Sequence, residues 1–145
     1  MIDRFERFVT VISGINRNLH RIMTEEMEKY GLKGSFAVYL IALYRNPAGM
    51  TAARLSEFCE KNKAAVSRAV TELEEKGLIV REGGYRASLR LTPEGKKAAG
   101  FLSERAKLAV DQAGKGLSEE HREIFYSSIE RIAQNLESIG DNGLV

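Results

Sequence analysis

The chain has 145 residues, which is enough for one domain or for two small lobes that pack closely together. Apolar residues make up 43% of it and charged residues 29%, a balance that excludes a disordered chain. No apolar run is long enough to span a bilayer, and the charged N-terminal stretch lacks the apolar core of a signal peptide. We therefore expect a cytoplasmic protein with no membrane partner.

The net charge of +2 is unevenly distributed along the chain. Residues 51–97 hold ten Lys/Arg against seven Asp/Glu, whereas the flanking segments hold twelve against thirteen. A local positive excess is what a polyanionic partner recognises. The single cysteine, Cys59, and the two histidines, His20 and His121, leave few soft ligands, so we expect no metal site and no cofactor.

The first segment predicts one long helix that ends at Tyr30-Gly31. A helix of about 28 residues is ~42 Å long, which exceeds the diameter of a small domain, so part of its apolar face needs a partner. A second helix is predicted from Ser35, as N-cap, to Asn46-Pro47. The apolar residues of the first helix recur at steps of three and four and form one stripe: Phe5, Phe8, Ile12, Ile15, Leu19 and Ile22.

Two short helices and a hairpin are predicted next. Thr51 is a suitable N-cap for the third helix, and Asn62 for a fourth that ends at Lys76-Gly77. Residues 78–80 are rich in β-branched side chains, and residues 88–91 alternate between polar and apolar. With Gly83-Gly84 as a two-residue turn, these segments predict an antiparallel hairpin.

Two further helices complete the predicted order. Thr92-Pro93 begins the fifth, with threonine at the N-cap and proline at the first helical position, and residues 114–116 break it. Ser118 precedes an acidic first turn that starts the last helix. Its apolar face comprises Ile124, Phe125, Ile129, Ile132, Leu136 and Ile139. The order α-α-α-α-β-β-α-α predicts a mainly α (α+β) fold with long terminal helices.

Residues 51–92 have the pattern of a winged helix-turn-helix, whose second helix enters the major groove of DNA. On the fourth helix, Val66, Val70 and Leu73 share the inward side. The opposite side and the hairpin carry small, polar and basic residues that suit phosphates and base edges. The candidate DNA-binding residues are Asn62, Lys63, Ala64, Ala65, Ser67, Arg68, Thr71, Arg81, Arg86 and Arg90.

The segment from Asn62 to Ile79, NKAAVSRAVTELEEKGLI, resembles the recognition-helix signature of the MarR family of bacterial transcriptional regulators. The run from Leu91 to Gly95, LTPEG, also resembles that family's entry into its fifth helix. The resemblance implies a homodimer that binds a pseudo-palindromic operator, as a repressor that a small ligand can relieve. It also implies a dimerisation lobe, residues 1–33 and 98–145, and a DNA-binding lobe, residues 34–97.

The sequence departs from the family pattern at two places. The hairpin from Arg81 to Arg86 is short, and its tip lacks the usual Asp-x-Arg, with Tyr85 at the position of the usual arginine. Ala64-Ala65 replace hydroxyl-bearing residues, which leaves apolar contact with thymine methyl groups at those positions. We therefore expect the hairpin to contribute less to DNA binding than the fourth helix.

Other readings of these residues remain open. The basic residues also fit an ordinary solvated surface, and a winged helix that binds protein without specific DNA binding is the alternative function. An enzyme is not expected, since the sequence has no phosphate-binding loop, catalytic triad or metal cluster. Cys59 fits a small buried hydrophobe better than a redox sensor. A small apolar or aromatic effector would have Met23 and Tyr39 as pocket walls and Arg17 or His20 as polar anchors.

Overall fold

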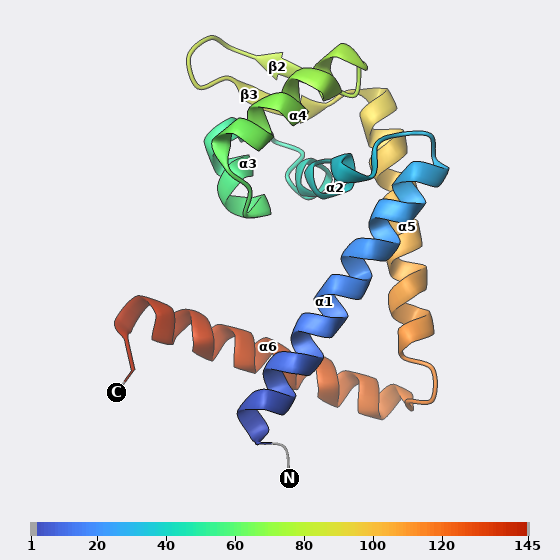
Figure 1. Cartoon of the computed structure of the whole chain (residues 1–145), viewed down its shortest axis with the longest axis vertical. Helices are drawn as coiled ribbons and strands as arrows, with labels where there is room; N and C mark the ends of the chain where they lie inside the picture. The colour runs from blue at the N-terminus through green and yellow to red at the C-terminus, as the bar shows by residue number, and fades with distance from the viewer. Residues whose placement is uncertain (1–2, 145) are drawn as a thin grey trace. The chain divides into compact units, whose positions relative to one another are not determined.

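Helices dominate the computed structural model, which describes residues 3–144 (Figure 1). By its contacts the chain divides into two units, one up to residue 109 and one from residue 110. Within the described residues the elements are α1 (Arg4–Lys29), the 3₁₀ turn η1 (Gly34–Phe36), α2 (Ala37–Arg45), β1 (Met50–Thr51), α3 (Ala52–Cys59), α4 (Lys63–Glu75), β2 (Ile79–Glu82), β3 (Ser88–Leu91), α5 (Pro93–Ala113) and α6 (Glu119–Asn142). The mainly helical fold predicted from the sequence is confirmed. No helix in the part that the structure describes has both the length and the apolar composition to cross a membrane.

Four predicted helix starts are confirmed by one kind of contact. In each, a side-chain oxygen accepts a hydrogen bond from the backbone N–H three residues further on, at 2.8 to 3.2 Å. This contact satisfies one of the N–H groups that a helix leaves free in its first turn. The capping residues are Thr51, Asn62, Thr92 and Ser118.

The predicted start of the second helix is wrong. Ser35 lies inside η1, and α2 follows with Phe36 at its N-cap position and no side-chain cap. The cause is tertiary packing, since the Phe36 side chain is buried in the core. Gly34 approaches α1 so closely that an added Cβ would collide with the Thr24 side chain. Burial of this segment, and not a cap, therefore fixes where α2 begins.

The hairpin is confirmed, but its predicted two-residue turn is wrong. The last paired residues of β2 and β3 are Glu82 and Ser88, so the loop comprises residues 83–87. A two-residue turn at Gly83-Gly84 would have shifted the register and turned the alternating side chains of β3 to the opposite face. The sheet also has a third strand that the sequence did not predict. β1 pairs with β3, giving the order β1-β3-β2.

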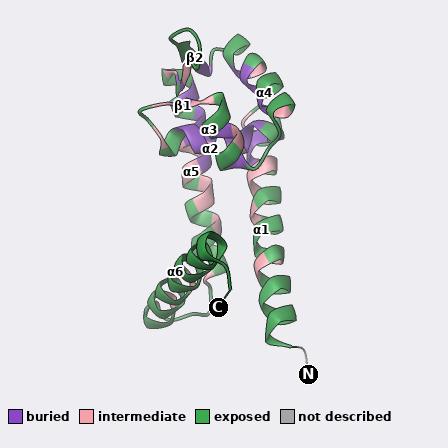
Figure 2. Ribbon diagram, turned by 90° about the vertical axis from the view of Figure 1, so that its left-hand side faces the viewer, coloured by how far each residue is buried: buried purple, intermediate pink, exposed green. Residues whose placement is uncertain are grey.

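The hydrophobic core lies in the winged-helix region. Buried side chains come from the last turns of α1, from α2 to α4, from the strands and from the first half of α5, as the purple ribbon in Figure 2 shows. Helix α6 has no buried residue. The largest fully buried side chains are Phe36, Met27, Leu40, Leu43, Leu55, Leu73, Leu89, Leu102, Val66 and Val70.

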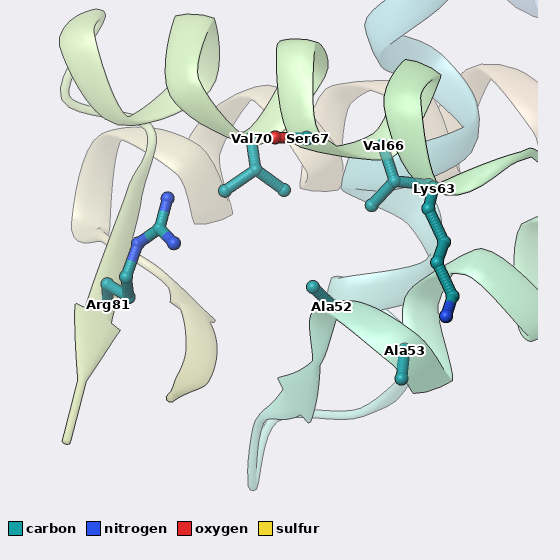
Figure 3. Close-up of a pocket in the computed structure, with 7 residues that line it drawn as sticks. All are labelled: Ala52, Ala53, Lys63, Val66, Ser67, Val70 and Arg81. Atoms are coloured by element: carbon teal, nitrogen blue, oxygen red, sulfur yellow. The ribbon is translucent and has the colours of Figure 1, made fainter. Parts of the chain in front are cut away.

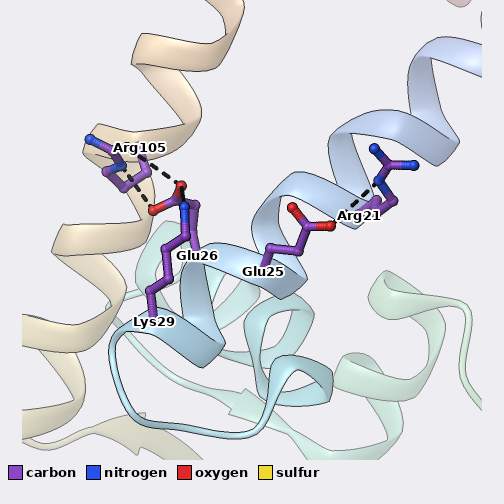
Figure 4. Close-up of polar contacts among 5 residues, drawn as sticks. All are labelled: Arg21, Glu25, Glu26, Lys29 and Arg105. Atoms are coloured by element: carbon purple, nitrogen blue, oxygen red, sulfur yellow. Dashed lines mark hydrogen bonds and ion pairs between the residues drawn. The ribbon is translucent and has the colours of Figure 1, made fainter.

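Helices α1 and α5 are joined by an ion pair, which Figure 4 shows, and by an aromatic pair. The Arg105 Nε donates to the Glu26 Oε2 at 3.0 Å, and Lys29 Nζ lies 3.2 Å from Glu26 Oε1. The hydrogen bond from Arg105 lowers the pKa of the Glu26 carboxyl below its usual value. At the C-cap of α1, the Tyr30 ring lies 5.0 Å from that of Phe101, centroid to centroid. These contacts fix the end of α1 beside α5.

Candidate nucleic-acid interface

Helix α4 presents the predicted DNA-binding residues on one side because its other side is held in the core. Val66, Val70 and Leu73 are each no more than 2% exposed, as the apolar spacing predicted. The opposite side is open to solvent, with Ala65 half-buried at its edge. The exposed residues of the helix and its cap are Asn62, Lys63, Ala64, Ser67, Arg68 and Thr71.

Some polar groups on this side are already engaged within the chain. The Asn62 Oδ1 accepts the hydrogen bond from the Ala65 N–H at 2.8 Å, so this oxygen is partly occupied while the NH₂ group remains able to donate. The Thr71 hydroxyl donates to the Ser67 carbonyl oxygen at 3.0 Å, which leaves the hydroxyl oxygen as an acceptor. Fewer hydrogen-bonding groups of α4 and its cap are therefore free to contact DNA than the amino-acid composition of the helix indicates.

The five candidate cations fall into two groups. Arg81 lies 3.4 Å from the Glu74 carboxylate, and Arg90 lies 3.5 Å from the Glu82 carboxylate. Arg90 also donates to the Ala48 carbonyl oxygen at 3.2 Å, which ties the β3 strand to the loop before β1. Within residues 3–144, the side chains of Lys63, Arg68 and Arg86 form no ion pair. These three cations are the ones free to neutralise phosphates.

An apolar hollow of about 290 Å³ opens between α3, α4 and β2 (Figure 3). Lys63 borders it from α4 and Arg81 borders it from β2. Sequence reasoning missed Ala52 and Ala53, since small apolar residues in a short helix give no pattern. The lining residues are Ala52, Ala53, Lys63, Val66, Ser67, Val70 and Arg81.

The tip of the hairpin extends away from the core. Tyr85 is 93% exposed, and the Arg86 guanidinium lies 5.5 Å from the centroid of the Tyr85 ring. Arg86 has a φ of 58°, in the left-handed region that non-glycine residues rarely adopt. An added Cβ at Gly83 or Gly84 would meet no atom within 4 Å. The tip is thus built from its own backbone turn, without support from another element.

The four predicted effector residues do not share one environment. Tyr39 is buried in the core, where burial raises the pKa of its phenol. Met23 is half-buried against the core, whereas Arg17 and His20 are exposed on α1. The hollow beside α4 is lined by none of them. An effector site at these residues stays a prediction.

Cys59 is buried, and its Sγ lies 3.7 Å from the Val38 carbonyl oxygen. Burial raises the pKa of the thiol to about 11, so it is protonated at neutral pH and a poor nucleophile. These properties fit the interpretation of Cys59 as a small buried hydrophobe. Across residues 3–144, no three His, Cys, Asp or Glu side chains come together in a way that could hold a metal ion.

Comparison with known proteins confirms the resemblance to the MarR family over part of the chain. Residues 30–86 match the model of the MarR family. No curated protein matches the chain. The fold is that of MarR-family transcriptional regulators of known structure.

Three of these structures illustrate the similarity. A putative MarR family regulator from Listeria monocytogenes, solved with a 26mer DNA, is 22% identical with a TM-score of 0.77, over 99% of this chain and 93% of that one. A MarR regulator from Methanosarcina mazei Go1 is 24% identical with a TM-score of 0.82, over 96% and 94%. MarR itself is 22% identical with a TM-score of 0.81, over 98% and 99%.

Proposed function

We propose that this chain, whose residues 30–86 carry the MarR-family winged helix, is a sequence-specific DNA-binding repressor that acts in the cytoplasm as a homodimer. The observation that carries the proposal is the exposed side of α4. There Lys63 and Arg68 are exposed and form no ion pair with a carboxylate of the described residues, and the other side of the helix is buried in the core. The Listeria monocytogenes protein of the same fold was crystallised with a 26mer DNA, which supports DNA as the partner.

In the proposed complex, the first turns of α4 enter the major groove. Ala64 and Ala65 are small enough to let the helix approach base edges and contact thymine methyl groups. Arg68 donates to guanine or to a phosphate, and Lys63 and Arg86 bind phosphates. Arg81 and Arg90 contribute less, since each already binds a carboxylate. Two α4 helices in a dimer would meet successive major grooves ~34 Å apart, on a pseudo-palindromic operator.

The proposal of a homodimer rests on apolar side chains in the two terminal helices. In α1, Phe5 and Val11 are 69% and 52% exposed, and in α6, Ile124 and Leu136 are 55% and 53% exposed. Large apolar patches of this kind usually mark an interface, and a two-fold arrangement is the commonest solution. Light scattering at micromolar concentration is expected to give twice the mass of the chain. A monomer mass would contradict the dimer.

Replacing Arg68 with alanine is expected to weaken operator binding by about 1–3 kcal/mol, which is about 5- to 150-fold in affinity. If Arg68 binds a phosphate, the dependence of log affinity on log salt also falls by about one unit. If it reads guanine, the loss is confined to particular base pairs. Gel shifts on one operator at several salt concentrations distinguish these cases. Arg45→Ala, at an exposed arginine that ends α2, is the matched control.

The same gel shifts test the proposed function as a whole. Unchanged affinity in both Lys63→Ala and Arg68→Ala would contradict the assignment of α4 as the recognition helix. A chain that binds no duplex at low salt would favour a winged helix that binds protein. Arg86→Ala is expected to cost less affinity than Arg68→Ala at one fixed salt concentration, because Arg86 lies on the short hairpin tip.

The proposed repressor would be relieved by a small apolar or aromatic ligand where α1 meets the core, near Met23. Tyr39 is buried, so a ligand that reaches its ring must open the core beside α2. A screen by thermal shift is expected to find ligands that stabilise the chain and weaken operator binding by about 5- to 150-fold, a coupling of 1–3 kcal/mol. Ligands that stabilise the protein without changing operator affinity would contradict this coupling.

A further inference from the structure

We infer that Lys33, which lies outside α4 and the hairpin, keeps Arg68 available to DNA by holding the Glu72 carboxylate away from it. The inference rests on the proposed function and goes beyond it, because it assigns a part in DNA binding to a residue of the connection between α1 and α2. Lys33 is a positioning residue in this account. It acts through Glu72 and Arg68, so its effect on DNA binding depends on the presence of both.

The ion pair between Lys33 and Glu72 joins two segments that are distant in the sequence. The Lys33 Nζ lies 2.7 Å from the Glu72 Oε2, the shortest ion pair among the described residues. Glu72 lies on α4, whereas Lys33 directly precedes η1, 39 residues earlier in the chain. The two side chains are 59% and 38% exposed, so the pair adds little to the stability of the fold. Its main effect is therefore on where the Glu72 carboxylate lies.

The position of Lys33 is fixed by its own segment. Its carbonyl oxygen accepts a hydrogen bond from the Phe36 N–H at 3.0 Å, which closes the turn of η1. Its Nζ lies 6.0 Å from the centroid of the Phe36 ring, and that ring is buried in the core. A cation at this distance from an aromatic ring is weakly attracted to it. The ammonium group is thus presented to α4 by a segment that the core anchors.

Arg68 is the neighbour that Glu72 has within α4 on the side of the DNA-binding residues. Residues four apart in a helix lie on the same side, where an arginine and a glutamate attract each other. Burial raises the pKa of the Tyr39 phenol, and the positive charge of Arg68 opposes part of this rise, so Arg68 lies toward α2. Lys33, which binds Glu72, immediately precedes η1 and α2. The cation and the carboxylate therefore lie on the same side of α4.

Loss of the Lys33 ammonium group would leave the Glu72 carboxylate to the basic residues of its own helix. These are Arg68 and Lys76, each four residues away, and neither forms an ion pair in the described part of the chain. An Arg68 side chain bound to Glu72 must leave it before it can bind DNA. A pair of this kind in a helix changes an equilibrium by about two-fold. Two half-sites in one operator would together give about four-fold.

The experiment uses the full chain, one duplex enriched from a random library by binding to it, and gel shifts at one fixed salt concentration. Lys33→Gln is expected to lower affinity by about four-fold. Lys33→Arg keeps the ion pair and is expected to bind as the parent does. Lys29→Gln is the matched control, since it removes the same charge from a nearby exposed lysine whose carboxylate partner, Glu26, also binds Arg105. An equal loss in Lys29→Gln would attribute the effect to net charge and contradict the inference.

Glu72→Gln breaks the same ion pair but also removes the carboxylate. It is expected to bind DNA at least as tightly as the parent, and adding it to Lys33→Gln is expected to restore the lost affinity. If the ion pair served only to place α4, Glu72→Gln would weaken binding as much as Lys33→Gln does. If Lys33 itself bound a phosphate, the double variant would stay weak. Either result would contradict the inference. Thermal unfolding is expected to show that all these variants are as stable as the parent.

Arg68→Ala separates failure of this inference from failure of the proposed function. In that background Lys33→Gln is expected to cost less than about two-fold in affinity, because Arg68 is no longer there for Glu72 to bind. A further loss of about four-fold would show that Lys33 does not act through Arg68. If Arg68→Ala weakens binding while Lys33→Gln binds as the parent does, the inference is wrong and the proposed function stands. If no duplex is enriched at all, the proposed function is wrong and the inference falls with it.

Discussion

Replacing Gly95 with alanine is expected to lower the free energy of unfolding by about 2–4 kcal/mol. An added Cβ at this position would collide with the carbonyl oxygen of Leu78 and crowd the Leu91 side chain. The obstacle is backbone, which cannot rotate away as a side chain can. The Leu78 oxygen also accepts a hydrogen bond from the Thr92 N–H at 3.0 Å, so a shift here strains the connection between the end of α4 and the start of α5.

Gly100→Ala is the matched control, since Gly100 lies in the same helix. There the added Cβ would stand 3.7 Å from the Tyr44 hydroxyl, an ordinary contact. Alanine favours helix over glycine, so this variant is expected to be as stable as the parent or more stable by up to about 1 kcal/mol. Urea denaturation followed by circular dichroism measures both. Equal stability of the two variants would mean that α5 does not abut Leu78.

Replacing Leu136 with glutamate is expected to convert the proposed dimer into a monomer and to weaken operator binding by about 100-fold or more. Leu136 is 53% exposed on α6, so the new charge disturbs no core within the chain. In the proposed interface it would be buried without a partner, which is strongly unfavourable. Loss of the second half-site removes the avidity on which operator binding depends. Light scattering and gel shifts give the two readouts.

Gln134→Glu adds the same negative charge on the opposite side of α6 and is the control. Two residues along a helix turn a side chain by about 200°, so Gln134 faces away from both Ile132 and Leu136. This variant is expected to remain dimeric and to bind the operator as the parent does. If Leu136→Glu also stays dimeric, the interface lies elsewhere. If it is monomeric with unchanged affinity, the chain binds DNA without dimerisation.

Local sequence signals predicted the helix boundaries well where a side chain acts on its own backbone. Thr51, Asn62 and Ser118 cap their helices, and Gly31, with a φ of 97°, follows the end of α1. The side of α4 that faces the core was equally predictable, because the spacing of Val66, Val70 and Leu73 repeats with the helical period. These features depend only on residues a few positions apart.

Features that depend on distant segments were not predictable. Strand β1 is two residues long, too short to show alternation, and it exists because β3 supplies its hydrogen bonds. The beginning of α2 depends on burial of Phe36, and the five-residue hairpin loop depends on how β2 and β3 align. In the candidate site, the sequence indicated five cations. It gave no sign that Glu74 and Glu82 would bind two of them.

Those two carboxylates bear on how such a protein would search a genome. To bind a phosphate, Arg81 must leave Glu74 and Arg90 must leave Glu82, so each gains less from the DNA backbone than a free cation does. The attraction between basic side chains and DNA phosphates is the same for every DNA sequence, and a genome contains far more non-operator sites than operators. A protein with fewer free cations on its DNA-binding surface dissociates sooner from each non-operator site. The internal ion pairs would thus leave more of the protein available for its operator.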